Sequence, residues 1–280
     1  MTRSAPLIGR GALVLVALAA SAGPRAGQLV FAILALGVVG MAHGASDLGV
    51  VAPARRPVFL LFYAAVSLIC LAWWTAFPAI ALPLFLIASA LHFAAEDAPD
   101  TSWPERCALG TGLIAAPALF HPGEYAALLD LAAGATTPPA IVTALRLIGG
   151  VVSVMMIVRA GRRRDGTLAV GTAALLLLPP LVGFSVGFLI LHALPQTEAR
   201  RRRMALASQP TYLRAIAPVL IAALLIGSLV GMLFLRIETS GVRGLFAAIA
   251  ALAMPHLLVT PAFTRPATRH APSRAVGLGL

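Results

Sequence analysis

Long apolar runs, separated by short polar segments, are the feature that most constrains the fold of this chain. Most of them approach the ~20 residues that a helix needs to cross the hydrocarbon core of a bilayer. We therefore predict an all-α, polytopic integral membrane helical bundle with about 8 to 10 membrane helices. The runs lie near residues 7–22, 28–43, 58–76, 79–95, 106–120, 139–158, 168–193, 213–235 and 243–262.

The composition leaves little room for a soluble domain, because hydrophobic residues make up 60% and charged residues 11% of the 280 residues. The polar stretches are short, so we expect a single membrane domain over residues 1–280, with an Arg-rich C-terminal tail at 263–280. Cys70 and Cys107 form neither a CxxC motif nor a zinc-type spacing, so we expect no disulfide and no thiolate metal site.

The net charge of +11 does not indicate nucleic-acid binding. The arginines lie in loops beside apolar runs, where they face anionic headgroups and set the orientation of the spans. We expect membrane lipids as partners and no nucleic acid. All 21 basic residues are arginine, a bias typical of GC-rich bacterial genomes.

The first run follows Arg3 and Arg10 and resembles a signal peptide in length and charge, with a cleavage-like sequence at 20–23. The alternative, which we favour, is a retained first helix.

The run at 168–193 is unusual because arginine clusters flank it, at 162–164 before it and 200–203 after it. A single crossing would leave one cluster outside, against the positive-inside rule. Pro179 and Pro180 lie at its middle and stop a helix, which favours a hairpin of two short helices. With the hairpin, both termini are predicted to be cytoplasmic. We expect a multi-pass protein of the bacterial inner membrane.

Several histidines lie in or at the ends of apolar segments, where an unpaired imidazole costs free energy. The predicted topology brings four of them to one depth in the inner half of the membrane, so we expect them to share a metal ion. They are His43, His92, His192 and His256. His121 and His270 are interpreted as solvated loop residues and left out of the site.

Three of these histidines have a polar residue four positions later, on the same helical face: Asp47, Glu96 and Gln196. Such side chains orient a ligating imidazole or coordinate the metal themselves. The alternative is that polar residues collect where helices leave the membrane. Gly44 either lets a substrate approach the ion or serves helix packing.

Neutral imidazoles with few carboxylates suit iron, zinc or copper better than magnesium or calcium. The chain has no HExxH, GxSxG or glycine-rich phosphate motif, so hydrolysis and phosphoryl transfer have no signature. Four histidines also exceed what one haem needs.

The chain resembles the Brp/Blh family of membrane β-carotene 15,15'-dioxygenases, which supply retinal to microbial rhodopsins. The resemblance is carried by an ordered set of motifs: GMAHGASD at 40–47, LIASALHFAAED at 86–97, PPLVGFSVGFLILH at 179–192 and MPHLLV at 254–259. It implies that His43, His92 and His192 hold Fe(2+), and that O2 cleaves a carotenoid such as β-carotene at its central double bond to give retinal.

The chain departs from the family pattern at Gln196, where the family has a second histidine four residues after the first. Three consequences are open: His256 completes the site, three histidines hold the iron with water in the open position, or the activity is lost or changed. Phe93, Phe184 and Phe188 either line the path of a lipophilic substrate or are ordinary packing aromatics.

Two other functions remain as alternatives to carotenoid cleavage. One is a divergent homologue that binds carotenoid, retinal or metal without cleaving. The other is a histidine-lined metal transporter, which would need an ionisable path across the membrane. The oligomeric state is left open.

Overall fold

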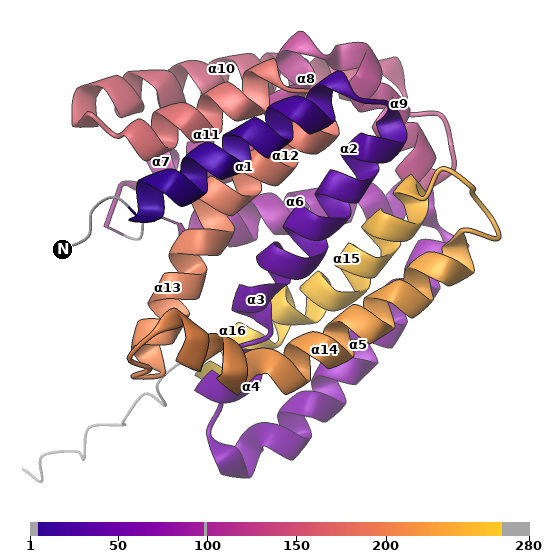
Figure 1. Ribbon diagram of the computed structural model, residues 1–280. Helices are drawn as coiled ribbons and strands as arrows, with labels where there is room; N and C mark the ends of the chain where they lie inside the picture. The colour runs from indigo at the N-terminus through magenta and orange to yellow at the C-terminus, as the bar shows by residue number, and fades with distance from the viewer. Residues whose placement is uncertain (1–4, 98–99, 265–280) are drawn as a thin grey trace, which may run out of the picture.

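The computed structural model describes residues 5–97 and 100–264, and these residues form helices without any strand (Figure 1). The helices up to residue 133 are α1 (Ala5–Ala22), α2 (Arg25–Ala32), η1 (Ile33–Gly40), α3 (Met41–Gly44), α4 (Asp47–Val50), η2 (Pro53–Arg55), α5 (Arg56–Ala76), α6 (Pro78–Glu96), α7 (Trp103–Ala115), α8 (Pro117–Phe120) and α9 (Pro122–Ala133). The remaining ones are α10 (Pro139–Arg163), α11 (Gly166–Leu177), α12 (Pro180–Phe188), η3 (Leu189–Ala193), α13 (Leu194–Arg203), α14 (Gln209–Phe234), α15 (Val242–Leu258) and α16 (Thr260–Thr264).

Seven helical stretches of the described chain are long and apolar enough to cross a membrane, which confirms the predicted helical membrane bundle. They are Arg25–Val50, Pro53–Ala76, Pro78–Glu96, Pro139–Arg163, Pro180–Arg203, Gln209–Phe234 and Val242–Thr264. Gly11–Ser21 and Gly166–Leu177 are shorter apolar helices. The expected run at 106–120 is divided between α7 and α8, and the sequence interpretation missed α9. The expected tail beyond Thr264, with His270, and Arg3 lie outside the described residues.

Prolines and polar caps mark many helix ends. Pro78, Pro139 and Pro180 stand in the first turn of their helices, where a missing N–H costs nothing. The Asp165 carboxylate accepts a hydrogen bond of 3.0 Å from the Leu168 backbone N–H and caps α11. Gly134 ends α9 in the left-handed conformation at φ 63°.

The break predicted at Pro179–Pro180 is present, since α11 ends at Leu177 and α12 begins at Pro180 and packs back against α11. The approach is close: a Cβ at Gly183 would lie 2.6 Å from the Ala174 carbonyl oxygen. The expectation of two short helices was wrong for the second one. It continues through η3 and α13 as a span of 24 residues, because Pro195 stands at the start of α13, just after a π-helical turn, where a missing N–H is tolerated.

Two π-helical segments meet at the centre of the bundle. η1 leads directly into α3, which carries His43, and η3 contains His192. The two segments contact each other, and α3 contacts both η3 and α13. π-Helical turns are rare and are found mostly at functional sites. α6 and α15, which also contact each other, bring His92 and His256 to the same region.

Candidate metal centre

Four imidazole rings from four separate elements form a closed cycle inside the bundle. The ring centroids are 5.0 Å apart for His43 and His192, 5.4 Å for His192 and His92, 5.0 Å for His92 and His256, and 5.1 Å for His256 and His43. All four side chains are buried. The histidines that the sequence placed at one depth therefore lie side by side.

The Nδ1 atoms of three rings are held by acceptors around the cycle. His43 donates to the Gly40 carbonyl oxygen at 2.6 Å, and His256 donates to Asp47 Oδ2 at 2.6 Å. His192 lies 3.0 Å from both carboxylate oxygens of Asp97. Because carbonyl and carboxylate oxygens only accept, Nδ1 carries a proton in each of these rings, and in the neutral imidazole Nε2 then keeps its lone pair.

The Nε2 atoms of His92, His192 and His256 are buried and have no hydrogen-bond partner among the described residues. An unsatisfied buried polar atom costs about 1–3 kcal/mol, so three of them in one cluster indicate a missing common partner. Imidazoles whose Nδ1–H is fixed by a carboxylate or carbonyl and whose Nε2 is free are typical metal ligands. The residues present therefore fit a bound transition-metal ion.

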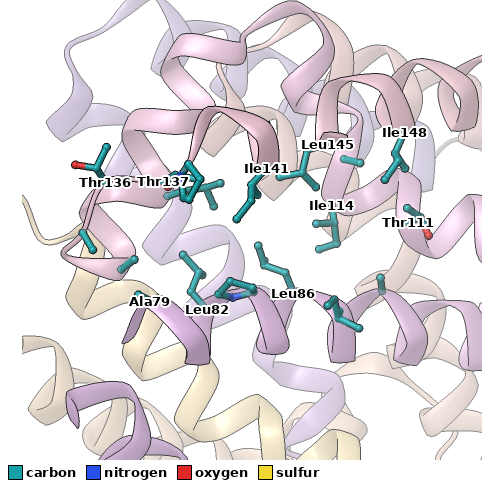
Figure 2. A pocket seen from close by; sticks show the side chains of 18 of the residues that line it. Ala79, Leu82, Leu86, Thr111, Ile114, Thr136, Thr137, Ile141, Leu145 and Ile148 are labelled. Atoms are coloured by element: carbon teal, nitrogen blue, oxygen red, sulfur yellow. The ribbon is translucent and has the colours of Figure 1, made fainter. Parts of the chain in front are cut away.

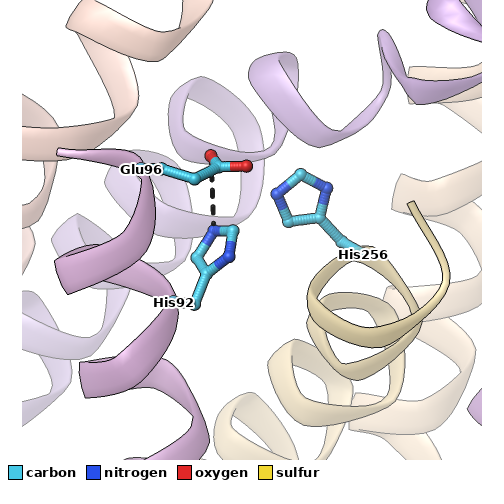
Figure 3. Close-up of side chains that lie close together, drawn as sticks. All are labelled: His92, Glu96 and His256. Carbon is cyan, nitrogen blue, oxygen red and sulfur yellow. Dashed lines mark ion pairs between the residues drawn. The ribbon is translucent and has the colours of Figure 1, made fainter. Parts of the chain in front are cut away.

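Glu96 adds a carboxylate to one side of the cycle. Its Oε2 lies 3.6 Å from His92 Nε2, and ligand atoms of His92, Glu96 and His256 lie within 4.8 Å of one another (Figure 3). His43 and His192 are not in this group of three, although their rings contact those of His256 and His92. Imidazole and carboxylate together are the usual donors of non-haem iron.

The position of Asp47, four residues after His43, suggested that its carboxylate would pair with the His43 ring, but it pairs with His256. The helix is interrupted after Gly44, so the four-residue rule does not apply between His43 and Asp47. Asp47 Oδ2 instead accepts hydrogen bonds from His256 and, at 2.7 Å, from the Thr260 hydroxyl. It supports a ring of α15 rather than its own element.

The Gln196 amide also makes its hydrogen bonds to partners of the cycle. Its Nε2 donates to the Glu96 carbonyl oxygen at 3.1 Å and to Asp97 Oδ1 at 3.2 Å. It thus holds the carboxylate that holds His192, while His256 takes part in the cycle itself.

Two polar residues of this region were missed by the sequence interpretation. Asp97 follows the last residue of α6 and so leaves the helical face that was considered. Arg200 was read only as one of an orienting arginine cluster, yet it is buried, with Nη2 3.6 Å from Asp47 Oδ1 and 3.8 Å from Glu96 Oε1. The sequence did carry a signal for both residues. Asp97 is adjacent to another acid, Glu96, and Arg200 is the arginine of its run that lies nearest to His192.

An apolar cavity of about 110 Å³ borders the cycle and is lined by all four histidines. The aromatic residues expected to lie near the ligands also line it: Phe93, Phe184 and Phe188. Phe184 and Phe188 are stacked at 5.9 Å, and Phe93 lies 4.6 Å from the His192 ring.

Gly44 lines a second cavity of about 480 Å³, together with His43 and His256. A Cβ at this position would be 3.9 Å from His256 Nδ1, an ordinary contact, so space alone does not require a glycine there.

Comparison with known proteins adds one match. The sequence model of a protein family described as beta-carotene 15,15'-dioxygenase matches residues 34–264, a range that contains the whole imidazole cycle and its supporting residues. No curated protein and no solved structure matches the chain significantly.

Proposed function

Because the chain belongs to the beta-carotene 15,15'-dioxygenase family, we propose that it is a membrane enzyme that cleaves a carotenoid such as β-carotene at its central double bond and releases retinal. One C=C bond and one O=O bond break and two C=O bonds form. Dioxygen is therefore the only co-substrate that the reaction needs.

The observation that carries this proposal is the group of three buried, unpartnered Nε2 atoms in a closed cycle of imidazoles. In the proposal Fe(2+) is held by His43, His92, His192 and His256, with Glu96 beside them. Ferrous iron, when bound, supplies the binding and activation of dioxygen. Gln196 is not needed as a ligand, because His256 provides the fourth imidazole and the amide is engaged with Asp97.

The chain's own residues keep the imidazoles in one protonation state and orientation. Asp47, Asp97 and the Gly40 carbonyl accept the Nδ1 protons. The buried guanidinium of Arg200 lies between the carboxylates of Asp47 and Glu96 and balances their charge in a region that excludes water.

The apolar cavity beside the cycle supports a hydrocarbon substrate. Its lining is almost entirely apolar apart from the histidines, so a polyene binds there without leaving polar groups unpaired. The phenylalanine rings give flat surfaces against which a conjugated chain packs.

The test is expression in a bacterial host that accumulates β-carotene, with extraction of pigments and metal analysis of the purified protein. We expect loss of β-carotene, formation of retinal and bound iron. His43→Ala and His92→Ala remove both the iron and the activity, whereas His121→Ala, outside the site, retains them. Folded wild-type protein that yields no retinal contradicts cleavage, and iron unchanged in His43→Ala and His92→Ala contradicts the site.

A further inference from the structure

A third cavity, of about 370 Å³, lies between α6 and α10, with α7 at one end and the loop after α9 at the other (Figure 2). On α6 its lining follows helical spacing, through residues 79, 82, 83, 86, 87, 90 and 91, so it occupies one face of that helix. The twelve steps from Ala79 to Leu91 correspond to about 18 Å along the axis. The groove therefore begins at the far end of α6 and stops beside His92.

This groove adjoins the histidine cavity. Leu86 of α6 and Ile114 of α7 line both, and so form their common wall. Through a different set of residues, the histidine cavity shares its lining with the 480 Å³ cavity that reaches α5 and α14. The shared residues there are His43, Phe188, Ile249, Ala253 and His256. Three apolar cavities thus lie in sequence, and the imidazole cycle borders the middle one.

The volumes follow the order large, small, large: about 370, 110 and 480 Å³. A ligand that fills such a series has two bulky ends and a slender middle. The outer cavities are also reached from the membrane, because large apolar side chains on their walls are exposed. Ile87 and Ile148 in the first groove are 55% and 44% exposed.

We propose that the groove between α6 and α10 binds one end of an elongated apolar substrate, whose other end lies in the cavity between α5 and α14. This inference rests on the proposed function, and it adds the reason why cleavage is central. With one end held on each side, the middle of the polyene lies at the imidazole cycle.

The first experiment measures carotenoid retention and is independent of turnover. Full-length protein is purified in detergent from cells that make no carotenoid, its metal is removed with a chelator, and it is then incubated with β-carotene. Bound pigment per protein is read from absorbance after gel filtration. Ile87→Trp and Ile148→Trp fill the groove, and we expect them to lower retention about tenfold, equivalent to about 1.4 kcal/mol. Leu84→Trp and Leu147→Trp are exposed positions on the same helices that do not line the groove, and we expect wild-type retention.

The second experiment compares substrates. In Ile87→Trp, we expect kcat/KM to fall about tenfold for a carotenoid with two ring ends. For an apocarotenoid with only one ring end, kcat/KM stays near the wild-type value, because that end binds in the α5–α14 cavity. Adding Ala222→Trp, which lines that cavity, abolishes cleavage of both.

The outcomes separate the two proposals. Groove-dependent pigment retention without any retinal contradicts the proposed cleavage and supports the groove. Retinal formation with equal retention in Ile87→Trp and Leu84→Trp overturns the groove, and is the result expected if a lipid acyl chain occupies it. Wild-type protein that retains no pigment also overturns it.

Discussion

At the scale of single residues, the outer hydrogen bonds of the imidazole cycle decide which nitrogen faces a metal. A carboxylate that accepts the Nδ1 proton fixes the tautomer and the ring orientation and makes Nε2 a better donor. Asp97 does this for His192, and Asp47 does it for His256. These acids belong to the site although neither is one turn from the ring that it serves.

If the cycle holds iron as proposed, removal of the Asp97 carboxylate is expected to weaken iron binding. We expect Asp97→Ala to lower iron affinity about 10- to 100-fold, the usual cost of losing such a partner, and Asp97→Asn to lower it less, because the amide oxygen still accepts a hydrogen bond. The measurement is a competition titration with a chelator of known affinity. Asp100→Ala, an exposed acid of the following turn, is the matched control. Equal affinities for Asp97→Ala and Asp100→Ala contradict this role.

The contacts of His256 and Gln196 also predict different roles for the two residues in metal binding. We expect His256→Ala to lose bound iron, since it removes one ring of the cycle. Gln196→Ala keeps the iron stoichiometry, because the amide nitrogen donates to Glu96 and Asp97 and the four imidazoles remain. Metal analysis after gel filtration reads this directly. If Gln196→Ala loses the iron and His256→Ala keeps it, the Gln196 amide and not the His256 imidazole is the fourth iron ligand.

The histidines were predictable because a polar ring is conspicuous in an apolar segment, and topology alone brought them to one depth. Their partners were not. Asp97 and His192 are 95 positions apart, and Asp47 and His256 are 209 positions apart, so no local spacing connects them. The four-residue rule paired three of the histidines with a polar residue of the same helix, and the break after Gly44 removed one of those pairs.

At the scale of elements, two prolines between two arginine clusters correctly predicted the break before α12, because backbone donors and the sidedness of charge are both readable from sequence. The π-helical turns at η1 and η3 were not predictable. They depend on how η1, η3 and α12 pack together, which apolar periodicity does not specify. α9 was missed because it is a 12-residue helix, shorter than the spans that hydropathy detects.

The turn between α14 and α15 gives a prediction for the pH dependence of stability. Partial burial disfavours the Glu238 carboxylate, but hydrogen bonds from the Ser240 hydroxyl and from the backbone N–H groups of Ser240 and Arg243 outweigh it and lower the pKa of Glu238. A lowered folded-state pKa stabilises the fold above the ordinary glutamate pKa of about 4.3, and the contribution is lost as pH falls through the lowered value.

We therefore expect Glu238→Gln to lower the Tm at pH 7 and to approach the wild-type Tm in acid. Thermal unfolding in detergent over the range from pH 7 to about 3 measures this. Glu124→Gln, at an exposed position of α9, controls for the general loss of one carboxylate. A Tm difference between Glu238→Gln and wild type that is constant over the range contradicts the assignment.

At the scale of the whole molecule, the imidazole cycle lies towards the arginine-rich end of the bundle. Arg200 follows His192 by eight residues on a continuous helix, about 12 Å. Arg203 Nη2 donates to the Thr264 carbonyl oxygen at 3.1 Å, which brings the end of the described chain to the same side. The loop at 134–138 lies at the opposite end, since its residues line the groove beside Ala79, at the other end of α6 from His92.

The positive-inside rule then predicts which end faces the cytoplasm. In a background with Cys70 and Cys107 replaced by alanine, we expect Ala135→Cys to react with a membrane-impermeant maleimide on intact bacterial cells. Ala207→Cys, in the exposed loop after the Arg200–Arg203 run, reacts only after lysis. The opposite labelling result would indicate the opposite orientation of the bundle in the membrane, with the imidazole cycle near the outer surface. The expected pattern places it near the cytoplasmic surface, at the arginine-rich end of the bundle.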